Sequence, residues 1–228
     1  MIAIITARGG SKRIPRKNIR DFCGQPIIAY SIKAALESQS FDEVMVSTDD
    51  AEIAAIAKSF GAVVPFLRSA KNADDFSTTS DVLREVLQQY KENGRTFESA
   101  CCIYPTAVFV TAQKLKDAAK LFADSNADSL ISATQFSFPI QRALKIENNL
   151  LKFFWPENLE KRSQDLEKSY HDCGQFYFFK SEILFPKGDL FTSNTIPFLV
   201  KESETQDIDT EEDFKIAQMK YKILNNLK

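Results

Sequence analysis

Short apolar runs alternate with amphipathic segments along most of the chain, and this alternation constrains the fold more than any other feature. The apolar runs have the length of buried strands and fall at 2–6, 43–48, 100–104, 129–136, 174–180 and 194–200. Segments with helical periodicity lie between or after them, at 26–37, 50–60, 79–93, 112–123 and 210–224. Strands separated by helices of roughly 10–15 residues indicate βαβ units. The sequence therefore predicts an α/β protein with a mostly parallel, twisted sheet flanked by helices.

Local signals suggest where some of these elements begin and end. Pro26 is expected in the first turn of the helix 26–37, and Gly61 is expected to end the helix 50–60. The segment 47–50, "STDD", is interpreted as a cap in which Ser47 or Thr48 acts together with Asp49. A further short strand is expected over 63–67.

The regular pattern stops between about 137 and 172, where aromatic, charged and turn-forming residues are mixed. We interpret this segment as an inserted arm, a hairpin that leaves the sheet and packs on a second subunit. No internal repeat or linker interrupts the rest of the chain. With 228 residues, the sequence is predicted to form one domain over 1–228 that carries this arm.

Bulk properties exclude several classes of function. A net charge of −2 and a pI near 5.6 argue against a general nucleic-acid-binding protein. The early apolar run from Ile2 to Ala7 is too short for a signal sequence or a membrane span. The four cysteines show no metal-site or disulfide-scaffold spacing, so we expect Cys101 and Cys102 to be inert thiols in a buried strand and the protein to be cytoplasmic. The single histidine, His171, nearly excludes a histidine-based zinc site.

The segment 8–18, "RGGSKRIPRKN", is the strongest candidate for a binding site. It follows the first predicted strand, so it is expected at the carboxyl edge of the sheet, where open α/β folds bind ligands. Gly9 and Gly10 allow the backbone to approach an anion with its N–H groups, although the spacing matches neither a Walker A nor a dinucleotide-binding motif. The cations on and beside it are Arg8, Lys12, Arg13, Arg16, Lys17 and Arg20. We expect Arg8 and Lys17 to bind phosphate, Lys12 and Arg13 to assist, and the other two to be solvated; a solvated loop is the alternative.

Asp207 and Asp209 form the second candidate site. In an extended segment, residues two apart point to the same side, and two hard carboxylates together with phosphate oxygens suit Mg²⁺. The alternative is that the acidic cluster belongs to a helix N-terminus, with Thr210 as its cap. That alternative explains the acids that follow Thr210, but it does not explain the two that precede it.

Three other groups of residues are candidates, and two of them leave two interpretations open. Asp75, Ser77 and Thr79 either contact a ribose or base, or they form a capping turn before the helix 79–93. Arg162 has no obvious carboxylate at helical spacing, so it is a candidate clamp for a substrate carboxylate. His171 beside Asp172 is either a base or a structural hydrogen-bonding residue.

Five stretches in order along the chain resemble the sugar-acid cytidylyltransferases, also called CMP–nonulosonate synthetases. They are "IITARGGSKRIPRKN", "FDEVMVSTDDAEIAAIAKSFGA", "DVLREVL", "RSQDL…YHDCGQFY" and "DIDTEEDF". The resemblance spans essentially the whole chain, and within the group it favours the branch that acts on pseudaminic acid. It implies a Rossmann-like nucleotidyltransferase fold, a homodimer joined through the arm, and Mg²⁺-dependent transfer of CMP from CTP to the 2-hydroxyl of a nine-carbon 2-keto sugar acid, with release of pyrophosphate.

The resemblance also assigns roles to individual residues. Arg8, Ser11 and Lys17 would hold the triphosphate together with the backbone of Ala7, Gly9 and Gly10, and Asn18 would bind the ribose. Arg68, Asp75, Ser77 and Thr79 would surround the cytidine, and Asp207 and Asp209 would hold the metal. Arg8 and Lys17 would stabilise the charge that develops on the phosphates. Asp209, a metal-bound hydroxide and His171 remain alternatives for the base.

The sugar acid would meet Tyr104, Gln141, Arg162 and Tyr177. Two of these positions differ from the pattern of the sialate enzymes, which usually have Gln where this chain has Tyr104 and Lys where it has Gln141. Legionaminate and N-acetylneuraminate are the alternative sugar acids, and KDO is the weakest. A non-catalytic module that binds nucleotide or RNA phosphate is the alternative from a different functional class.

Overall fold

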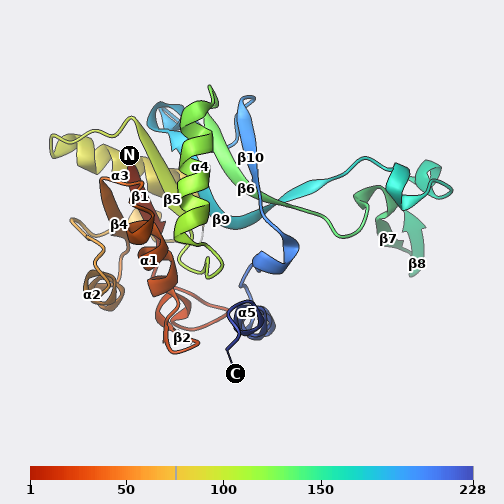
Figure 1. Cartoon of the computed structure of the whole chain (residues 1–228), viewed down its shortest axis with the longest axis horizontal. Coiled ribbons are helices and arrows are strands. Elements are labelled where there is room, and N and C mark those ends of the chain that lie inside the picture. The colour runs from red at the N-terminus through yellow and green to blue at the C-terminus, as the bar shows by residue number, and fades with distance from the viewer. Residues whose placement is uncertain (75, 228) are drawn as a thin grey trace.

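A six-stranded mixed sheet forms the centre of the protein. The computed structural model describes residues 1–74 and 76–227. The strands are β1 (Ile2–Thr6), β4 (Glu43–Ser47), β5 (Ser99–Ile103), β6 (Ser129–Gln135), β9 (Tyr170–Lys180) and β10 (Thr195–Leu199). Their order is β10-β6-β9-β5-β1-β4 (Figure 1). β9 runs antiparallel to β5 and β6, whereas the other neighbouring strands are parallel. The predicted mostly parallel sheet is confirmed.

Helices cover both faces of this sheet. They are α1 (Ile28–Ser38), α2 (Ala51–Ser59), α3 (Thr79–Glu92), α4 (Ala112–Asp124) and α5 (Glu211–Leu224). Side chains alternate along β1, so Ala3 and Ile5 pack with α1, α2 and α4, while Ile2 and Ile4 pack with α3. Each of these four side chains is fully buried, which explains why β1 is an uninterrupted apolar run. None of the helices in the described residues has both the length and the apolar character needed to cross a bilayer.

Single turns of 3₁₀ helix and two short strand pairs complete the described chain. The turns lie at Lys17–Ile19, Ala70–Asn72, Ile140–Arg142, Pro156–Asn158, Ser163–Asp165, Ser181–Leu184 and Glu202–Glu204. One strand pair joins β2 (Asp21–Phe22) to β3 (Gln25–Pro26), and the other joins β7 (Leu144–Glu147) to β8 (Leu150–Phe153). Around β2, an apolar cluster contributed by the loop after β1, the segment 108–109 and α5 fixes the C-terminal helix against the body.

Three local predictions are wrong. Pro26 belongs to β3 rather than to a helix, because it and Gln25 pair with β2 and the helix begins only at Ile28. The expected strand over 63–67 is reduced to a single bridge between Val63 and Met45. The cap of α2 is Asp50, whose carboxylate accepts hydrogen bonds from the next turn, and not Asp49.

The arm, residues 137–172, extends away from the body and carries the β7–β8 hairpin at its far end (Figure 1). Asn148 and Asn149 connect the two strands with positive φ angles of 55° and 61°, a combination that fits the right-handed twist of a hairpin. The hairpin strands are almost fully exposed, including large apolar side chains. The last residues of the arm, 170–172, are the start of β9 and pair with β6.

The carboxyl ends of β1 and β5 define a topological switch point. From β1 the chain crosses to β4 on one side, and later returns to β5 on the other side of β1. The loops that leave β1 and β5 therefore diverge and leave a crevice between them. The segment "RGGSKRIPRKN" leaves β1 at this point, as predicted.

Candidate functional site

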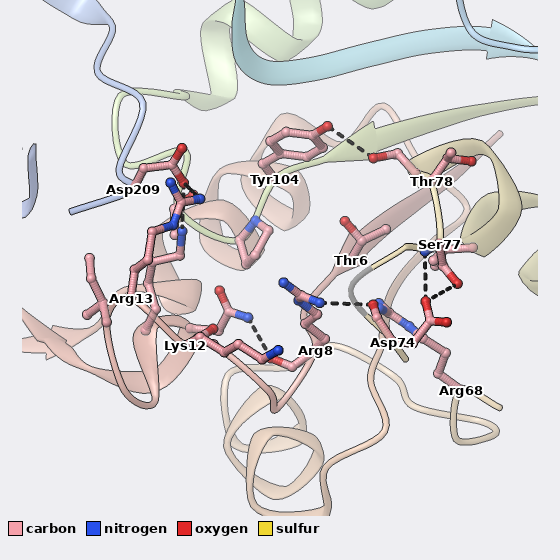
Figure 2. Close-up of a pocket in the computed structure, with 18 of the residues that line it drawn as sticks. Thr6, Arg8, Lys12, Arg13, Arg68, Asp74, Ser77, Thr78, Tyr104 and Asp209 are labelled. Carbon is pink, nitrogen blue, oxygen red and sulfur yellow. Dashed lines mark hydrogen bonds and ion pairs between the residues drawn. The ribbon is translucent and has the colours of Figure 1, made fainter. Parts of the chain in front are cut away.

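A cavity of about 380 Å³ lies at this switch point (Figure 2). Four chain segments supply its walls: the end of β1 with the loop behind it, the segment between α2 and α3 with the start of α3, the residues after β5, and the extended segment before α5. The lining residues are Thr6, Arg8, Ser11, Lys12, Arg13, Ile14, Lys17, Asn18, Arg68, Asn72, Asp74, Ser77, Thr78, Thr79, Val82, Tyr104, Pro105, Thr106, Asp207 and Asp209. Thr6 and Asp209, more than two hundred positions apart in the sequence, thus face one cavity.

Most of the residues proposed from the sequence lie in this lining. They are Arg8, Ser11, Lys17, Asn18, Arg68, Ser77, Thr79, Tyr104, Asp207 and Asp209. Ala7 is instead fully buried in the core, and Gly9 and Gly10 lie outside the lining. Asp75 lies outside the described residues.

Gly9 has a different local role from the one expected. Its N–H donates a hydrogen bond of 2.8 Å to Asp49 rather than facing the cavity. A Cβ at this position would lie 2.8 Å from Oδ2 of Asp50, closer than real Cβ contacts, so only glycine fits without a shift. Gly9 therefore allows the loop after β1 to pack closely against the N-terminus of α2.

Arg16 and Arg20 hold the same loop in place. Arg16 has a left-handed backbone with φ of 56°, and its guanidinium contacts Asp50 and Glu52 at 2.5 Å each. Arg20 contacts Glu211 at 2.5 Å. The expectation that both cations are merely solvated is wrong, because each joins the loop to the first turn of a helix.

The aspartate pair and two loop cations meet at one end of the cavity. Arg13 donates to Asp209 at 2.8 Å, and the Lys17 ammonium lies 3.7 Å from the same carboxylate. Lys17 also donates to the carbonyl of Ile208 at 2.5 Å. Burial raises the pKa of Asp207, and the charge of Asp209 raises it further. Asp207 and Asp209 thus form an electronegative position beside an electropositive loop.

The helix-capping interpretation of the acids after Asp209 is also confirmed. Thr210 caps α5, and Asp213 completes the reciprocal capping box. The Asp213 carboxylate also accepts a hydrogen bond from the backbone N–H of Asp209 at 3.1 Å, so its hydrogen bonds all serve the start of the helix. The cap therefore holds the backbone of Asp209 but leaves the carboxylates of Asp207 and Asp209 at the cavity.

Arg68 is a lining residue whose guanidinium is fixed by hydrogen bonds. It is 8% exposed, and its guanidinium donates to the side chain and the carbonyl of Ser47 at 3.1 and 2.6 Å. Burial lowers the pKa of Arg68. Arg8 donates to the carbonyl of Asp74 at 2.9 Å (Figure 2). Asn18 donates to the carbonyl of Arg8 at 2.9 Å.

The capping interpretation of the segment before α3 is confirmed, and the contact of this segment with a ribose or base stays a prediction. Thr78 forms a capping box with Asp81. Ser77 and Thr79 line the cavity; the Ser77 hydroxyl donates to Asp74 at 2.7 Å, and the Thr79 hydroxyl lies 3.1 Å from that of Tyr104. The capping turn thus presents hydroxyl groups to the cavity on both sides of its cap residue.

Three of the residues expected to contact the sugar lie outside the cavity lining. Gln141 and Arg162 are on the arm, where Gln141 donates to the carbonyl of Glu167 at 2.9 Å. Arg162 contacts Asp165 at 3.0 Å, so the statement that it has no carboxylate at helical spacing is wrong. Tyr177 is 3% exposed and lies behind Tyr104.

The surroundings of His171 fit a structural hydrogen-bonding residue and do not fit a catalytic base. Its Nδ1 lies 2.9 Å from the carbonyl of Asp172, and its ring packs against Phe136 with centroids 4.6 Å apart. It is also absent from the lining of the cavity. The structure therefore favours the structural alternative for this residue.

Several lining residues were not proposed from the sequence. Thr6 is the last residue of β1, and Pro105 and Thr106 follow β5. Their position at the carboxyl ends of adjacent strands is the signal that would have identified them. Asp74 and Asn72 carry no comparable signal, because the segment between α2 and α3 reaches the cavity only through the fold.

Comparisons with known proteins agree with this geometry. The family model described as "Cytidylyltransferase" matches residues 2–222. The pseudaminic acid cytidylyltransferase of Campylobacter jejuni subsp. jejuni serotype O:2 is 40% identical over 223 residues, which are 97% of this chain and 96% of that protein. A CMP-N,N'-diacetyllegionaminic acid synthase of Legionella pneumophila is 32% identical over 227 residues, with coverage of 96% and 94%.

A solved structure supports the fold independently of sequence. The CMP:2-keto-3-deoxy-manno-octonic acid synthetase complexed with CTP superimposes with a TM-score of 0.70 over 99% of both chains, at 16% sequence identity. This identity is low enough that the likeness concerns the fold alone. Together with the family model and the more similar relatives, the cavity at the switch point leads to one assignment: the chain belongs to the cytidylyltransferase family.

Proposed function

We propose that this protein transfers CMP from CTP to the 2-hydroxyl of pseudaminic acid and releases pyrophosphate. The observation that carries the proposal is the single cavity that combines the cationic loop after β1 with Asp207 and Asp209. A triphosphate needs positive groups for its oxygens, and its divalent cation needs carboxylates as ligands. The 40% identical relative named pseudaminic acid cytidylyltransferase supports the choice of sugar acid.

The residues of the loop stabilise the phosphates during an in-line displacement at the α-phosphorus. Arg8 and Lys17 line the cavity and neutralise the charge that develops on the phosphate oxygens and on the leaving pyrophosphate. Lys17 is preorganised for this role, because its ammonium is held by the carbonyl of Ile208. Asn18 keeps Arg8 in place through its hydrogen bond to the Arg8 carbonyl. Ser11 helps to hold the triphosphate, and Arg68, Ser77 and Thr79 surround the cytidine.

Asp207 and Asp209 are suitable ligands for Mg²⁺. Both are hard oxygen donors at the cavity. Burial, and then the charge of Asp209, raise the pKa of Asp207, and a bound cation would stabilise both carboxylates in their charged form. No group of three or more metal-ligating side chains occurs among residues 1–74 and 76–227, so phosphate and water oxygens would complete the coordination. Bound there, Mg²⁺ would supply charge stabilisation and acidify the sugar hydroxyl. Asp209 is the protein group proposed to accept the proton, since it lies at the cavity and His171 does not.

We also propose a homodimer in which the arm of one chain completes the cavity of its partner. Gln141 and Arg162, the two arm residues expected to meet the sugar acid, lie apart from the cavity of their own chain. The arm exposes large apolar side chains, with Phe138, Ile146 and Leu151 at 80%, 75% and 69%. Apolar surface of this extent on one element is typical of a protein interface.

The test is pyrophosphate release from CTP with purified pseudaminate, legionaminate, N-acetylneuraminate and KDO, each with and without Mg²⁺. The proposal expects release with pseudaminate that depends on Mg²⁺. Preference for legionaminate would favour the second candidate, which the 32% identical legionaminic acid synthase motivates. Release with none of the four acids, together with salt-sensitive binding to long RNA, would instead favour the non-catalytic module.

A further inference from the structure

Two cations of the loop after β1 contact the same carboxylate oxygen. The Arg13 guanidinium donates to Oδ1 of Asp209 at 2.8 Å, and the Lys17 ammonium lies 3.7 Å from that oxygen (Figure 2). All three side chains line the cavity. Asp209 is one of the two carboxylates proposed above to hold Mg²⁺, so a role for the two cations at its Oδ1 rests on the proposed function.

The surroundings of Lys17 fix its position. Its ammonium donates to the carbonyl of Ile208 at 2.5 Å, and its side chain is only 21% exposed. Ile208 is itself fully buried in the apolar cluster around β2. Lys17 therefore stays beside Asp209 when the contents of the cavity change.

The backbone that carries Asp209 is constrained as well. Its N–H donates to Asp213 at 3.1 Å, and Asp213 belongs to the capping box of α5. The carbonyl that precedes this N–H is the one that accepts from Lys17. The carboxylate of Asp209 is thus held at the cavity, and an exchange of its partners requires movement of the partners.

Arg13 is the partner that can move. Its side chain is 66% exposed, about three times as much as that of Lys17. Solvent screens an ion pair of this exposure, so the contact with Asp209 is weak and is exchanged at little cost. A guanidinium is also well suited to phosphate oxygens, to which it donates two parallel hydrogen bonds.

A divalent cation on Asp209 would compete with Arg13 for one oxygen. The two positive groups repel each other, and Oδ1 cannot serve both at full strength. A triphosphate in the same cavity offers Arg13 a second set of negative oxygens. The two ligands of the cavity therefore favour the same movement of Arg13, away from Asp209 and toward phosphate.

We propose that Arg13 is an exchangeable counter-ion that couples nucleotide binding to metal binding. Arg13 neutralises Asp209 until CTP supplies phosphate oxygens, and its departure leaves Oδ1 to the divalent cation. By linkage, cation binding at Asp209 favours the transfer of Arg13 to the phosphates to the same degree. Lys17 keeps its position in both arrangements.

Two binding measurements without a sugar acid test this exchange. Electron paramagnetic resonance follows the binding of Mn²⁺, as a probe for Mg²⁺, to the protein alone, and calorimetry follows the binding of CTP in EDTA. Arg13→Ala should bind Mn²⁺ about two- to fivefold more tightly and CTP about two- to fivefold more weakly, the size of an exposed ion pair. The opposite signs are diagnostic, because a merely disturbed loop would weaken the binding of both ligands.

A double-mutant cycle on CTP binding in EDTA tests the pair itself. Asp209→Asn releases Arg13 to the phosphates and also removes a negative charge near them. Its gain in CTP affinity should be about two- to fivefold larger with Arg13 present than in the Arg13→Ala background. Lys215→Gln is the control for Mn²⁺ binding, because it removes one positive charge from an exposed position of α5 outside the cavity lining.

Three results would overturn the inference: an unchanged affinity of Arg13→Ala for either ligand, a Mn²⁺ effect that Lys215→Gln reproduces, or equal gains from Asp209→Asn in both backgrounds. A wild-type protein that binds neither Mn²⁺ nor CTP would overturn the proposed function as well. No sugar acid enters these measurements, so a wrong choice of sugar in the proposed function is detected separately from a wrong role for Arg13.

Discussion

Lys17 combines a charge at the cavity with a fixed position, and it is the residue on which we expect catalysis to depend most. Lys17→Ala removes the ammonium but not the loop, which Arg16 and Arg20 still attach to the helices. Turnover should fall roughly a hundredfold or more, the size of effect seen when a charge-stabilising donor is removed. Steady-state pyrophosphate release measures it, with the exposed Lys116→Ala on α4 as control. Near-normal turnover in a folded Lys17→Ala protein would rule out this role.

Asp207 is expected to act through cation binding. Asp207→Asn keeps the shape of the side chain and removes half of the charge of the aspartate pair. The Mg²⁺ concentration for half-maximal activity should rise on the order of tenfold, and binding of Mn²⁺ with CTP, followed by electron paramagnetic resonance, should weaken in parallel. Glu212→Gln in the first turn of α5 is the control, because it removes the same charge from an exposed neighbour. Equal effects of both variants would indicate a general change of charge and no ligand at Asp207.

The site residues that sequence could identify are those whose chemistry is local. The segment "RGGSKRIPRKN" combines charge, glycine and its position after a strand, and Asp207 and Asp209 precede a recognisable helix cap. Tyr177 could be recognised only as part of a motif. Its distance from the cavity depends on the bulge in β9, and no spacing in the sequence encodes that bulge.

At the scale of elements, the contact between the loop after β1 and α2 has a measurable dependence on pH. Asp50 caps α2 and pairs with Arg16, and these contacts lower the pKa of Asp50 to about 2. A carboxyl with a lower pKa in the folded state stabilises the protein above its unfolded pKa, near 4, and this contribution is lost as the pH falls toward 2.

Two substitutions separate the ion pair from the cap. Asp50→Asn keeps a good cap but breaks the pair, so it should cost at most about 1 kcal/mol at pH 7, because the pair is partly exposed. Asp50→Ala loses the cap as well and should cost about 1 kcal/mol more. Urea unfolding at pH 7 and at pH 3 provides the values. The gap between wild type and Asp50→Asn should shrink at the lower pH; a gap that is constant or grows would contradict the role assigned to the charge.

The helices were more predictable than the sheet because their ends carry chemical signals. Thr78, Thr111 and Thr210 each accept from the first turn of the helix that follows, and the predicted helices match those structures to within a few residues. Pro26 was misleading because proline is equally acceptable in the short edge strand β3. The apolar composition of β9 predicted a strand, but only the tertiary fold determines that it runs antiparallel between β5 and β6.

For the whole molecule, the sequence predicted the position of the arm in the chain but not its direction in space. The loss of regular pattern after residue 136 shows where the chain leaves the sheet. The arm extends away from the body (Figure 1). No pattern in the sequence indicates this direction. Exposed apolar side chains on this arm are the physical basis for expecting a second chain.

Oligomeric state gives a first test of that expectation. Phe138→Ser together with Ile146→Ser replaces two side chains that are 80% and 75% exposed, so the body should remain folded. Light scattering after size-exclusion chromatography should show a dimer for the wild type and a shift toward monomer for this variant. Met219→Ser on α5 is the control, since Met219 is 64% exposed but lies far from the arm in the sequence. A wild-type monomer at micromolar concentration would overturn the proposed homodimer.

Mixing two inactive variants tests whether the arm serves the cavity of its own chain or that of its partner. Lys17→Ala disables a cavity and keeps a normal arm, whereas Arg162→Ala disables an arm and keeps a normal cavity. In a mixed dimer with shared sites, the intact arm of the first chain reaches the intact cavity of the second, which restores one site in two. Random assortment makes half of the dimers mixed, so co-expression should recover about a quarter of wild-type activity. If each arm served its own cavity, every site in the mixture would contain a defect, and the activity would stay at the level of the separate variants.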